Sequence, residues 1–259
     1  MQRSVGVVVP AYRPDVERLV EYVDRIAERL SPATIRVELD APRSEVVAAL
    51  ADTPATVATA PYRRGKGRAI TAGFEALDTD VLAFADDDGS TPADSFAAVV
   101  RPVAEDEADL AVGSRRHPDS PMGHHRTFGR RRLGDAFAWL ARRLVEPSLY
   151  DYQCGAKAVS RAAWNELREH LYEPGFAWDV ELVAIAGALD QRVVEVPVEW
   201  HDQPDSTVSP VGTSLALARG VLAARHRAGL IHESRLHGAI DARRAEQSRL
   251  VETHGPDRP

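Results

Sequence analysis

A short apolar run that ends in three consecutive aspartates constrains the fold of this chain most strongly. Residues 81–85 read Val-Leu-Ala-Phe-Ala, and Asp86, Asp87 and Asp88 follow directly. A strand that is apolar on both faces is typical of a parallel sheet with helices on each side. Open sheets of this kind bind ligands beyond the carboxyl ends of their strands. The sequence therefore predicts a ligand site at the three carboxylates.

The aspartate triplet also indicates which ligand it would take. Adjacent carboxylates repel one another unless a cation offsets their charge, and Mg²⁺ is often shared between carboxylates and substrate phosphates. A metal-bound nucleotide diphosphate is the leading interpretation. The alternative is an acidic turn, because residues 88–92 read Asp-Gly-Ser-Thr-Pro, and these residue types favour turns.

Residues 4–112 alternate between short apolar runs and segments with helical spacing. The expected strands cover residues 4–9, 35–39, 56–60, 81–85 and 109–112, and the expected helices cover residues 14–30, 43–50, 67–77 and 92–104. This alternation predicts a doubly wound α/β fold, with a mostly parallel central sheet and helices on both of its faces.

The second half of the chain is less regular. The expected helices cover residues 134–145, 161–171, 178–189 and 215–231, and the expected strands cover residues 154–160 and 192–200. Pro197 indicates that the last of these strands lies at a sheet edge. We expect one α/β domain over residues 1–210, an amphipathic helical extension over residues 211–240 and a charged, disordered tail over residues 241–259.

The charge of the chain is unevenly distributed. Its 259 residues carry a net charge of −7 at pH 7, yet the segments 115–132 and 214–244 are rich in arginine. Basic segments on an acidic chain suggest a phosphate or an anionic surface as partner, although solvated helix faces also fit. The single cysteine, Cys154, fits a reducing compartment. The sequence has no run of about 18 apolar residues, so we expect no segment that spans a bilayer.

A basic segment with two glycines, Arg-Arg-Gly-Lys-Gly-Arg at residues 63–68, precedes an expected helix. Glycines let the backbone approach a ligand closely, and a helix N-terminus favours anions. The segment lacks the spacing of a Walker A loop. It could hold a phosphate or position the end of a strand.

Short motifs follow one another along residues 5–210. They are Val7-Val8-Val9-Pro10-Ala11-Tyr12, Asp40, Arg64-Gly65-Lys66-Gly67, Ala85-Asp86-Asp87-Asp88-Gly89-Ser90-Thr91, Val112-Gly113-Ser114-Arg115, Asp151-Tyr152-Gln153-Cys154-Gly155-Ala156-Lys157, Gly175-Phe176-Ala177-Trp178-Asp179-Val180-Glu181-Leu182 and Val196-Pro197-Val198-Glu199-Trp200. In this order they resemble a family 2 glycosyltransferase of the GT-A fold, and more narrowly its dolichyl-phosphate mannose and glucose synthase branch. The segment Asp-Tyr-Gln-Cys-Gly is the most specific to that branch.

The resemblance implies a donor site at the aspartate triplet. Asp86 and Asp88 match the family's DxD pair, with Asp87 at its variable middle position. Asp88 would bind Mg²⁺ or Mn²⁺ on the diphosphate, and Asp86 would share the metal or hold the ribose.

The resemblance also implies a pocket for the nucleotide sugar. The residues implied in binding it are Pro10, Ala11, Tyr12, Asp40, Lys66, Asp86 and Asp87. Asp40 would meet the edge of the nucleobase. Where the family often has Asn and Glu after the tyrosine, this chain has Arg13 and Pro14.

On the acceptor side the resemblance implies Asp151 and Gln153 as catalytic residues. An alcohol acceptor would need a general base, which Asp151 would supply. A phosphate monoester is already mostly dianionic at neutral pH, so with that acceptor Asp151 would position groups and Gln153 would assist through its amide. Arg115 and Arg131 could contact the acceptor phosphate.

The remaining charged residues of the motifs have simpler interpretations. Asp179 and Glu181 share the start of a helix, where acids interact favourably with the helix dipole, although a sugar-binding role is equally open. Lys157 is expected on the surface at a strand end. The adjacent His124 and His125 are not expected to bind a metal.

The motifs and the resemblance imply a metal-dependent, inverting glycosyltransferase with a GT-A fold and a helical C-terminal extension. It would move a hexose from a nucleotide sugar, of the UDP-glucose or GDP-mannose type, to a polyprenyl (dolichyl) phosphate for lipid-linked sugar and protein glycosylation. Residues 126–132 and 215–231 would attach it to the cytoplasmic face of a membrane, and no nucleic acid is expected as partner. The alternatives are a saccharide acceptor, with Asp151 as base, and a nucleotide-sugar-binding module without turnover.

Overall fold

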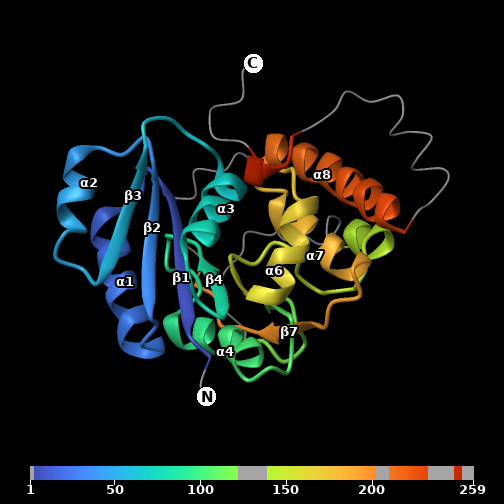
Figure 1. Ribbon diagram of the computed structural model, residues 1–259, viewed down its shortest axis with the longest axis horizontal. Coiled ribbons are helices and arrows are strands. Elements are labelled where there is room, and N and C mark those ends of the chain that lie inside the picture. Colours follow the sequence, from blue (N-terminus) through green and yellow to red (C-terminus); the bar gives the residue numbers. More distant parts are fainter. Residues whose placement is uncertain (1–2, 122–138, 202–209, 233–247, 253–259) are drawn as a thin grey trace.

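A seven-stranded sheet with the strand order β3-β2-β1-β4-β6-β5-β7 forms the centre of the molecule (Figure 1). The computed structural model describes residues 3–121, 139–201, 210–232 and 248–252. The strands are β1 (Val5–Tyr12), β2 (Thr34–Asp40), β3 (Ala55–Ala60), β4 (Val81–Ala85), β5 (Leu110–Ser114), β6 (Ala156–Ser160) and β7 (Val193–Pro197). The strand pairs are parallel except the two that β6 makes with β4 and β5.

Helices cover both faces of the sheet, as the alternating sequence predicts. They are α1 (Val16–Leu30), α2 (Ser44–Ala49), α3 (Lys66–Ala76), α4 (Ala93–Ala104), α6 (Arg161–Leu167), α7 (Trp178–Ala188) and α8 (Pro210–Ile231). Side chains along β1 alternate between two hydrophobic clusters: Val7 and Val9 pack with α1 and α4, whereas Val8 packs with α3, α6 and α7. This alternation follows from the two-residue period of a strand. The central strands are therefore buried on both sides.

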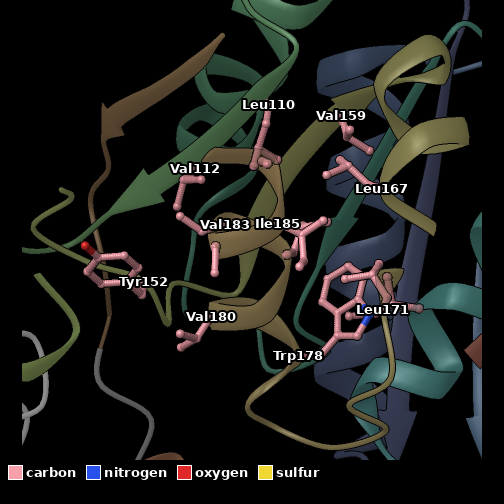
Figure 2. Packing of buried hydrophobic residues seen from close by; sticks show 14 of the residues in the cluster. Leu110, Val112, Tyr152, Val159, Leu167, Leu171, Trp178, Val180, Val183 and Ile185 are labelled. Atoms are coloured by element: carbon pink, nitrogen blue, oxygen red, sulfur yellow. The ribbon is translucent and has the colours of Figure 1, made fainter. Parts of the chain in front are cut away.

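The cluster on the α3 side contains the largest buried side chains. Figure 2 shows part of it, in which Val183 and Ile185 of α7 lie with Leu110 and Val112 of β5. Trp178, at the start of α7, is fully buried and makes an edge contact with Phe84 of β4, with 5.6 Å between the ring centroids. The beginning of α7 is thus fixed against the strand that ends in the aspartate triplet.

The local sequence explains where α1 begins and which face it buries. Its N-cap Asp15 accepts a hydrogen bond from the backbone N–H of Arg18 at 3.2 Å, which satisfies one of the free donors of the first turn. The buried residues Leu19, Tyr22, Val23 and Ile26 follow helical spacing and form one apolar stripe.

The predicted strands and helices of the first half are confirmed, with ends that differ by a few residues. The edge position that Pro197 indicated is also confirmed, because β7 is the last strand of the sheet. The position of β6 was not predicted: it enters between β4 and β5 and runs antiparallel to both. Of the helix expected at residues 134–145, the structure describes residues 139–144, which are helical.

The C-terminal part packs more closely on the domain than the sequence suggests. Val221 and Ala224 of α8 are fully buried in the same cluster as α7. The prediction of a disordered tail is wrong for residues 248–252, because Leu250 is 4% exposed and its N–H donates to the carbonyl of Leu171 at 3.0 Å. Burial of the apolar Leu250 side chain stabilises the packing of this short segment against the domain. Among the described residues, no helix has the length and apolar character needed to cross a membrane.

The two leucines Leu250 and Leu222 allow the docking of the tail to be tested. Leu→Ala changes in cores cost about 2–5 kcal/mol, and since Leu250 lies on a terminal segment we expect Leu250→Ala to lower the free energy of unfolding by about 2 kcal/mol. Leu222 is 56% exposed, so Leu222→Ala should change it by less than about 0.5 kcal/mol. Urea unfolding of both variants measures this, and equal effects would contradict the packing of the tail.

Candidate active site

A pocket of about 510 Å³ opens at the carboxyl ends of β1, β2 and β4. Its wall includes Pro10, Ala11 and Tyr12 from β1, Asp40 from β2, Asp86, Asp87 and Asp88 after β4, and Gly65 and Lys66 at the start of α3. The predicted donor-site residues are therefore brought together, at the edge where open α/β sheets bind ligands. Phe176, from the loop before α7, also lines the pocket.

Asp86 is held from two sides. Its carboxylate pairs with the Lys66 ammonium at 2.9 Å, and its backbone N–H donates to the Gly155 carbonyl at 2.9 Å. A Cβ at Gly155 would lie 1.9 Å from the Asp86 Oδ2 atom, so only glycine leaves room for this carboxylate. The glycine of the Asp-Tyr-Gln-Cys-Gly motif therefore shapes the donor site.

The other two carboxylates of the triplet are electrostatically crowded. Burial, with the charges of Asp86 and Asp88, raises the pKa of Asp87 to about 8. Burial and Asp86 also raise the pKa of Asp88, although its carboxylate accepts a hydrogen bond from the Ser90 N–H at 2.9 Å. An added positive charge would relieve this crowding.

The donor atoms of the triplet fit a hard divalent cation that arrives with its substrate. Within the described part of the chain, no three His, Cys, Asp or Glu side chains converge into a complete metal site. Mg²⁺ commonly uses one or two carboxylates and completes its coordination with water and substrate phosphates. The carboxylates of Asp86 and Asp88 are suited to supply these one or two protein ligands.

Lys157 corrects a prediction made from the sequence. It was expected on the surface, but it is 1% exposed, because β6 is an inner strand and this side chain points into the helical layer. Its ammonium lies 2.5 Å from Asp179 Oδ1 and donates to the Cys154 carbonyl at 2.8 Å. Asp179 is fully buried and its other oxygen lies 2.9 Å from the Lys66 Nζ atom. In the structure, Asp179 thus forms ion pairs with Lys66 and Lys157.

These ion pairs keep Lys66 and Asp179 charged. Burial alone would lower the pKa of Lys66, but the carboxylates of Asp179 and Asp86 outweigh it and raise that pKa. Burial would raise the pKa of Asp179, but Lys157 and Lys66 lower it. Lys66 therefore presents a full positive charge at the floor of the pocket.

Asp40 lines the pocket, and both of its carboxylate oxygens already accept hydrogen bonds. Oδ2 accepts the backbone N–H groups of Arg64 at 2.6 Å and Gly65 at 3.1 Å, and Oδ1 accepts the Arg64 Nε–H at 2.7 Å. Arg64 also pairs with the buried Glu38 at 2.9 Å. In the structure Asp40 fixes the loop before α3, so a contact to a nucleobase remains a prediction.

Three arginines of the pocket wall were not assigned to the site from the sequence, although Arg63 belongs to the basic segment at residues 63–68. Arg63 lies 4.5 Å and Arg13 lies 5.2 Å from the centre of the Tyr12 ring, and Arg13, Arg18 and Arg63 all line the pocket. The departure from the family pattern after Tyr12 was the available signal, since it placed an arginine at the end of β1. Phe176 belongs to the motif at residues 175–182, but no role in the pocket was assigned to it from the sequence.

The predicted acceptor-side residues Asp151 and Arg115 neutralise each other. Asp151 is 2% exposed, and the Arg115 guanidinium holds it with two hydrogen bonds, of 2.6 Å and 2.9 Å, supplemented by the Arg115 N–H at 3.2 Å. Burial alone would raise the pKa of Asp151, but Arg115 lowers it far below its ordinary range. A carboxylate with so low a pKa is a poor proton acceptor, and a contact between Arg115 and an acceptor phosphate remains a prediction.

Gln153 connects this ion pair to the loop that carries Phe176. Its N–H donates to Asp151 Oδ1 at 3.1 Å, and its side-chain amide donates to the Phe176 carbonyl at 3.2 Å. Arg131, His124 and His125 lie outside the described residues.

The loop at residues 172–177 is anchored by Glu181, which lies in the first turn of α7 as predicted. Glu181 is 1% exposed, accepts the N–H groups of Tyr172 at 3.0 Å and Glu173 at 2.7 Å, and pairs with Arg227 of α8. A buried acid with these partners holds the loop and the C-terminal helix together. A sugar contact is not available to it in this arrangement.

Stability should depend on pH through the pair of Asp151 and Arg115. Because its folded-state pKa is depressed, Asp151 stabilises the fold fully above its unfolded pKa of about 3.9, and this contribution is lost as the pH falls below that value. We expect Asp151→Asn to lower the free energy of unfolding by about 3 kcal/mol at pH 7. The difference from the parent should shrink between about pH 5 and pH 3, as followed by urea unfolding. A constant difference would contradict the ion pair.

Known proteins resemble this chain in sequence. Residues 6–167 match the family described as "Glycosyl transferase family 2". "Glycosyltransferase AglD" of Haloferax volcanii is 34% identical over 160 residues, 62% of this chain and 25% of that protein. "Dolichyl-phosphate beta-glucosyltransferase ALG5C" of Trichomonas vaginalis is 30% identical over 241 residues, 86% and 72% of the two chains. The chain thus spans a quarter of the first relative's length.

Solved structures share the fold at low identity. Glucosyl-3-phosphoglycerate synthase of Mycobacterium tuberculosis superposes with a TM-score of 0.64 at 22% identity, over 88% of this chain and 81% of that chain. Mannosyl-3-phosphoglycerate synthase of Rubrobacter xylanophilus gives 0.64 at 17% identity, over 94% and 77%. These likenesses confirm the predicted GT-A fold and show the fold alone. The family match and the curated relatives establish that the chain belongs to glycosyl transferase family 2, in its dolichyl-phosphate glycosyltransferase-like branch.

Proposed function

We propose that this chain transfers glucose from UDP-glucose to a polyprenyl phosphate such as dolichyl phosphate, with inversion at the anomeric carbon. The names of the curated relatives support the glucosyl group and the lipid phosphate. The observation that carries the choice of acceptor is the state of Asp151, which Arg115 holds as a buried carboxylate of very low pKa. A phosphate acceptor needs no general base, because it is mostly dianionic at neutral pH. A saccharide hydroxyl would need one.

Different residues of the pocket would bind different parts of the donor. Tyr12, with Arg63 beside its ring, offers a flat wall and hydrogen-bond donors for the nucleobase. Asp88 and Asp86 would hold Mg²⁺ or Mn²⁺ on the diphosphate. When bound, the cation would offset the charge of the departing nucleotide. Solved structures of the M. tuberculosis relative contain Mn²⁺ together with UDP, which supports a divalent cation here.

Attachment to a membrane surface at its cytoplasmic face is part of the proposal. Trp139 and Leu222 are each 56% exposed and Tyr150 is 42% exposed. Arg143 lies 5.6 Å from the Trp139 ring and Arg142 lies 5.6 Å from the Tyr150 ring. Exposed aromatic side chains beside arginines suit the boundary between lipid headgroups and acyl chains.

The main test is transfer by the purified chain. With radiolabelled UDP-glucose, dolichyl phosphate and Mn²⁺ we expect a radiolabelled product that extracts into organic solvent, and GDP-mannose should give much less. Asp88→Asn should lower kcat/KM by about 10²–10³, since it removes a group that acts on the leaving diphosphate. The matched control Asp24→Asn changes an exposed aspartate of α1 and should leave kcat/KM within about twofold. Transfer to a saccharide but not to lipid phosphate, or donor binding without any transfer, would overturn the proposal.

Membrane attachment is tested separately by flotation with vesicles. At low salt the chain should float with vesicles that contain anionic lipid, and less so at about 0.5 M salt, because surface electrostatics are screened. Trp139→Ser should reduce the floating fraction at least about threefold, since it removes an exposed aromatic side chain. Recovery of the parent chain in the unbound fraction at every salt concentration would contradict this part of the proposal.

A further inference from the structure

Four side chains of alternating charge form a continuous row from the core to the pocket. Lys157 Nζ lies 2.5 Å from Asp179 Oδ1, Asp179 Oδ2 lies 2.9 Å from Lys66 Nζ, and Lys66 Nζ lies 2.9 Å from Asp86 Oδ1. The row joins β6, the start of α7, the start of α3 and the end of β4. These elements are far apart in the sequence, and the row therefore exists only in the folded chain.

The row is buried except at its pocket end. Asp179 is fully buried and Lys157 is 1% exposed, while the Lys66 side chain is 10% exposed and lines the pocket. The ring of Phe84 lies below both lysines, 5.2 Å from the Lys66 Nζ atom and 5.6 Å from the Lys157 Nζ atom. Buried charges are costly unless each is paired, so the geometry of each member is set by its neighbours.

This arrangement leaves Lys66 little freedom. One oxygen of Asp179 is taken by Lys157, and the other faces Lys66. The backbone at the start of α3 is fixed as well, because a Cβ at Gly67 would lie 2.7 Å from the Cβ of Trp178. Lys66 therefore meets Asp86 at a fixed place, and Gly155 closes the opposite side of that carboxylate.

We propose that Asp179, anchored by Lys157, is a positioning residue that orients Lys66, and that Lys66 in turn fixes Asp86 for the metal-bound diphosphate of the donor. The inference rests on the proposed function and adds two residues, Asp179 and Lys157, that do not touch the donor. It assigns them an effect on the affinity for the cation–nucleotide complex, beyond any effect on stability.

A double-mutant cycle on Mn²⁺ and UDP binding tests the inference. Asp179→Asn and Lys66→Met should each weaken the affinity for Mn²⁺ at saturating UDP by about 10–100-fold, the usual range for residues that orient metal ligands. Because Asp179 acts through Lys66, the double variant should be no weaker than the weaker-binding single variant. Isothermal titration calorimetry supplies the constants, and thermal unfolding reports stability in parallel.

The control substitution is at Glu75, which lies on the same helix as Lys66. Glu75→Gln removes an ion pair to Arg168 near the other end of α3 and should leave the Mn²⁺ affinity within about twofold. If Asp179→Asn does not fold, Lys157→Met combined with Asp179→Leu removes the buried pair as a whole, which is often tolerated, and leaves Lys66 without its anchor. That variant should show the same loss of affinity.

The outcomes separate this inference from the proposed transfer reaction. Additive losses in the cycle, or variants that lose only stability and bind Mn²⁺ and UDP as the parent does, overturn the positioning role. A parent that binds Mn²⁺ and UDP but transfers no sugar overturns the transfer reaction while the cycle still supports the inference. A parent that binds no UDP in the presence of Mn²⁺ overturns both.

Discussion

Crowding of negative charge at the end of β4 is the constraint on which the rest of this site depends. The triplet Asp86–Asp88 follows a strand that is buried along its whole length, so the backbone cannot move apart to relieve repulsion. Lys66 offsets part of the charge, and the crowding that remains is visible in the raised pKa of Asp87 and of Asp88. The proposed cation, which would enter with the diphosphate of the donor, would complete this balance.

The insertion of β6 between β4 and β5 supplies the partners of the triplet. Ala85 pairs with Ala156 in the ladder, and Gly155 therefore lies opposite Asp86, where its missing side chain makes room for the carboxylate. Two residues later Lys157 turns into the helical layer and anchors Asp179. One antiparallel strand thus contributes both the space for Asp86 and the first charge of the row that holds it.

On the predicted acceptor side, the charges of Arg115 and Asp151 offset each other. The fork between Arg115 and Asp151 leaves Asp151 a poor base, which suits the proposed phosphate acceptor because a phosphate needs no general base. Gln153 links this pair to the Phe176 loop, and Glu181 links the same loop to Arg227 of α8. Hydrogen bonds and an ion pair therefore connect the pocket wall to the C-terminal helix.

The sequence by itself determined the alternating elements, the buried strand that ends in carboxylates and the family motifs, because hydrophobic periodicity and short motifs are local signals. It also predicted a ligand site at the sheet edge where the pocket lies. It did not determine the insertion of β6, the burial of Lys157 or the pairing of Asp151 with Arg115, since each depends on which residues meet across long stretches of chain. Whether Asp179 interacts with a helix dipole, a sugar or two lysines was decided only by the tertiary structure, because the partners of a charged side chain, and hence its chemistry, are fixed by what packs against it.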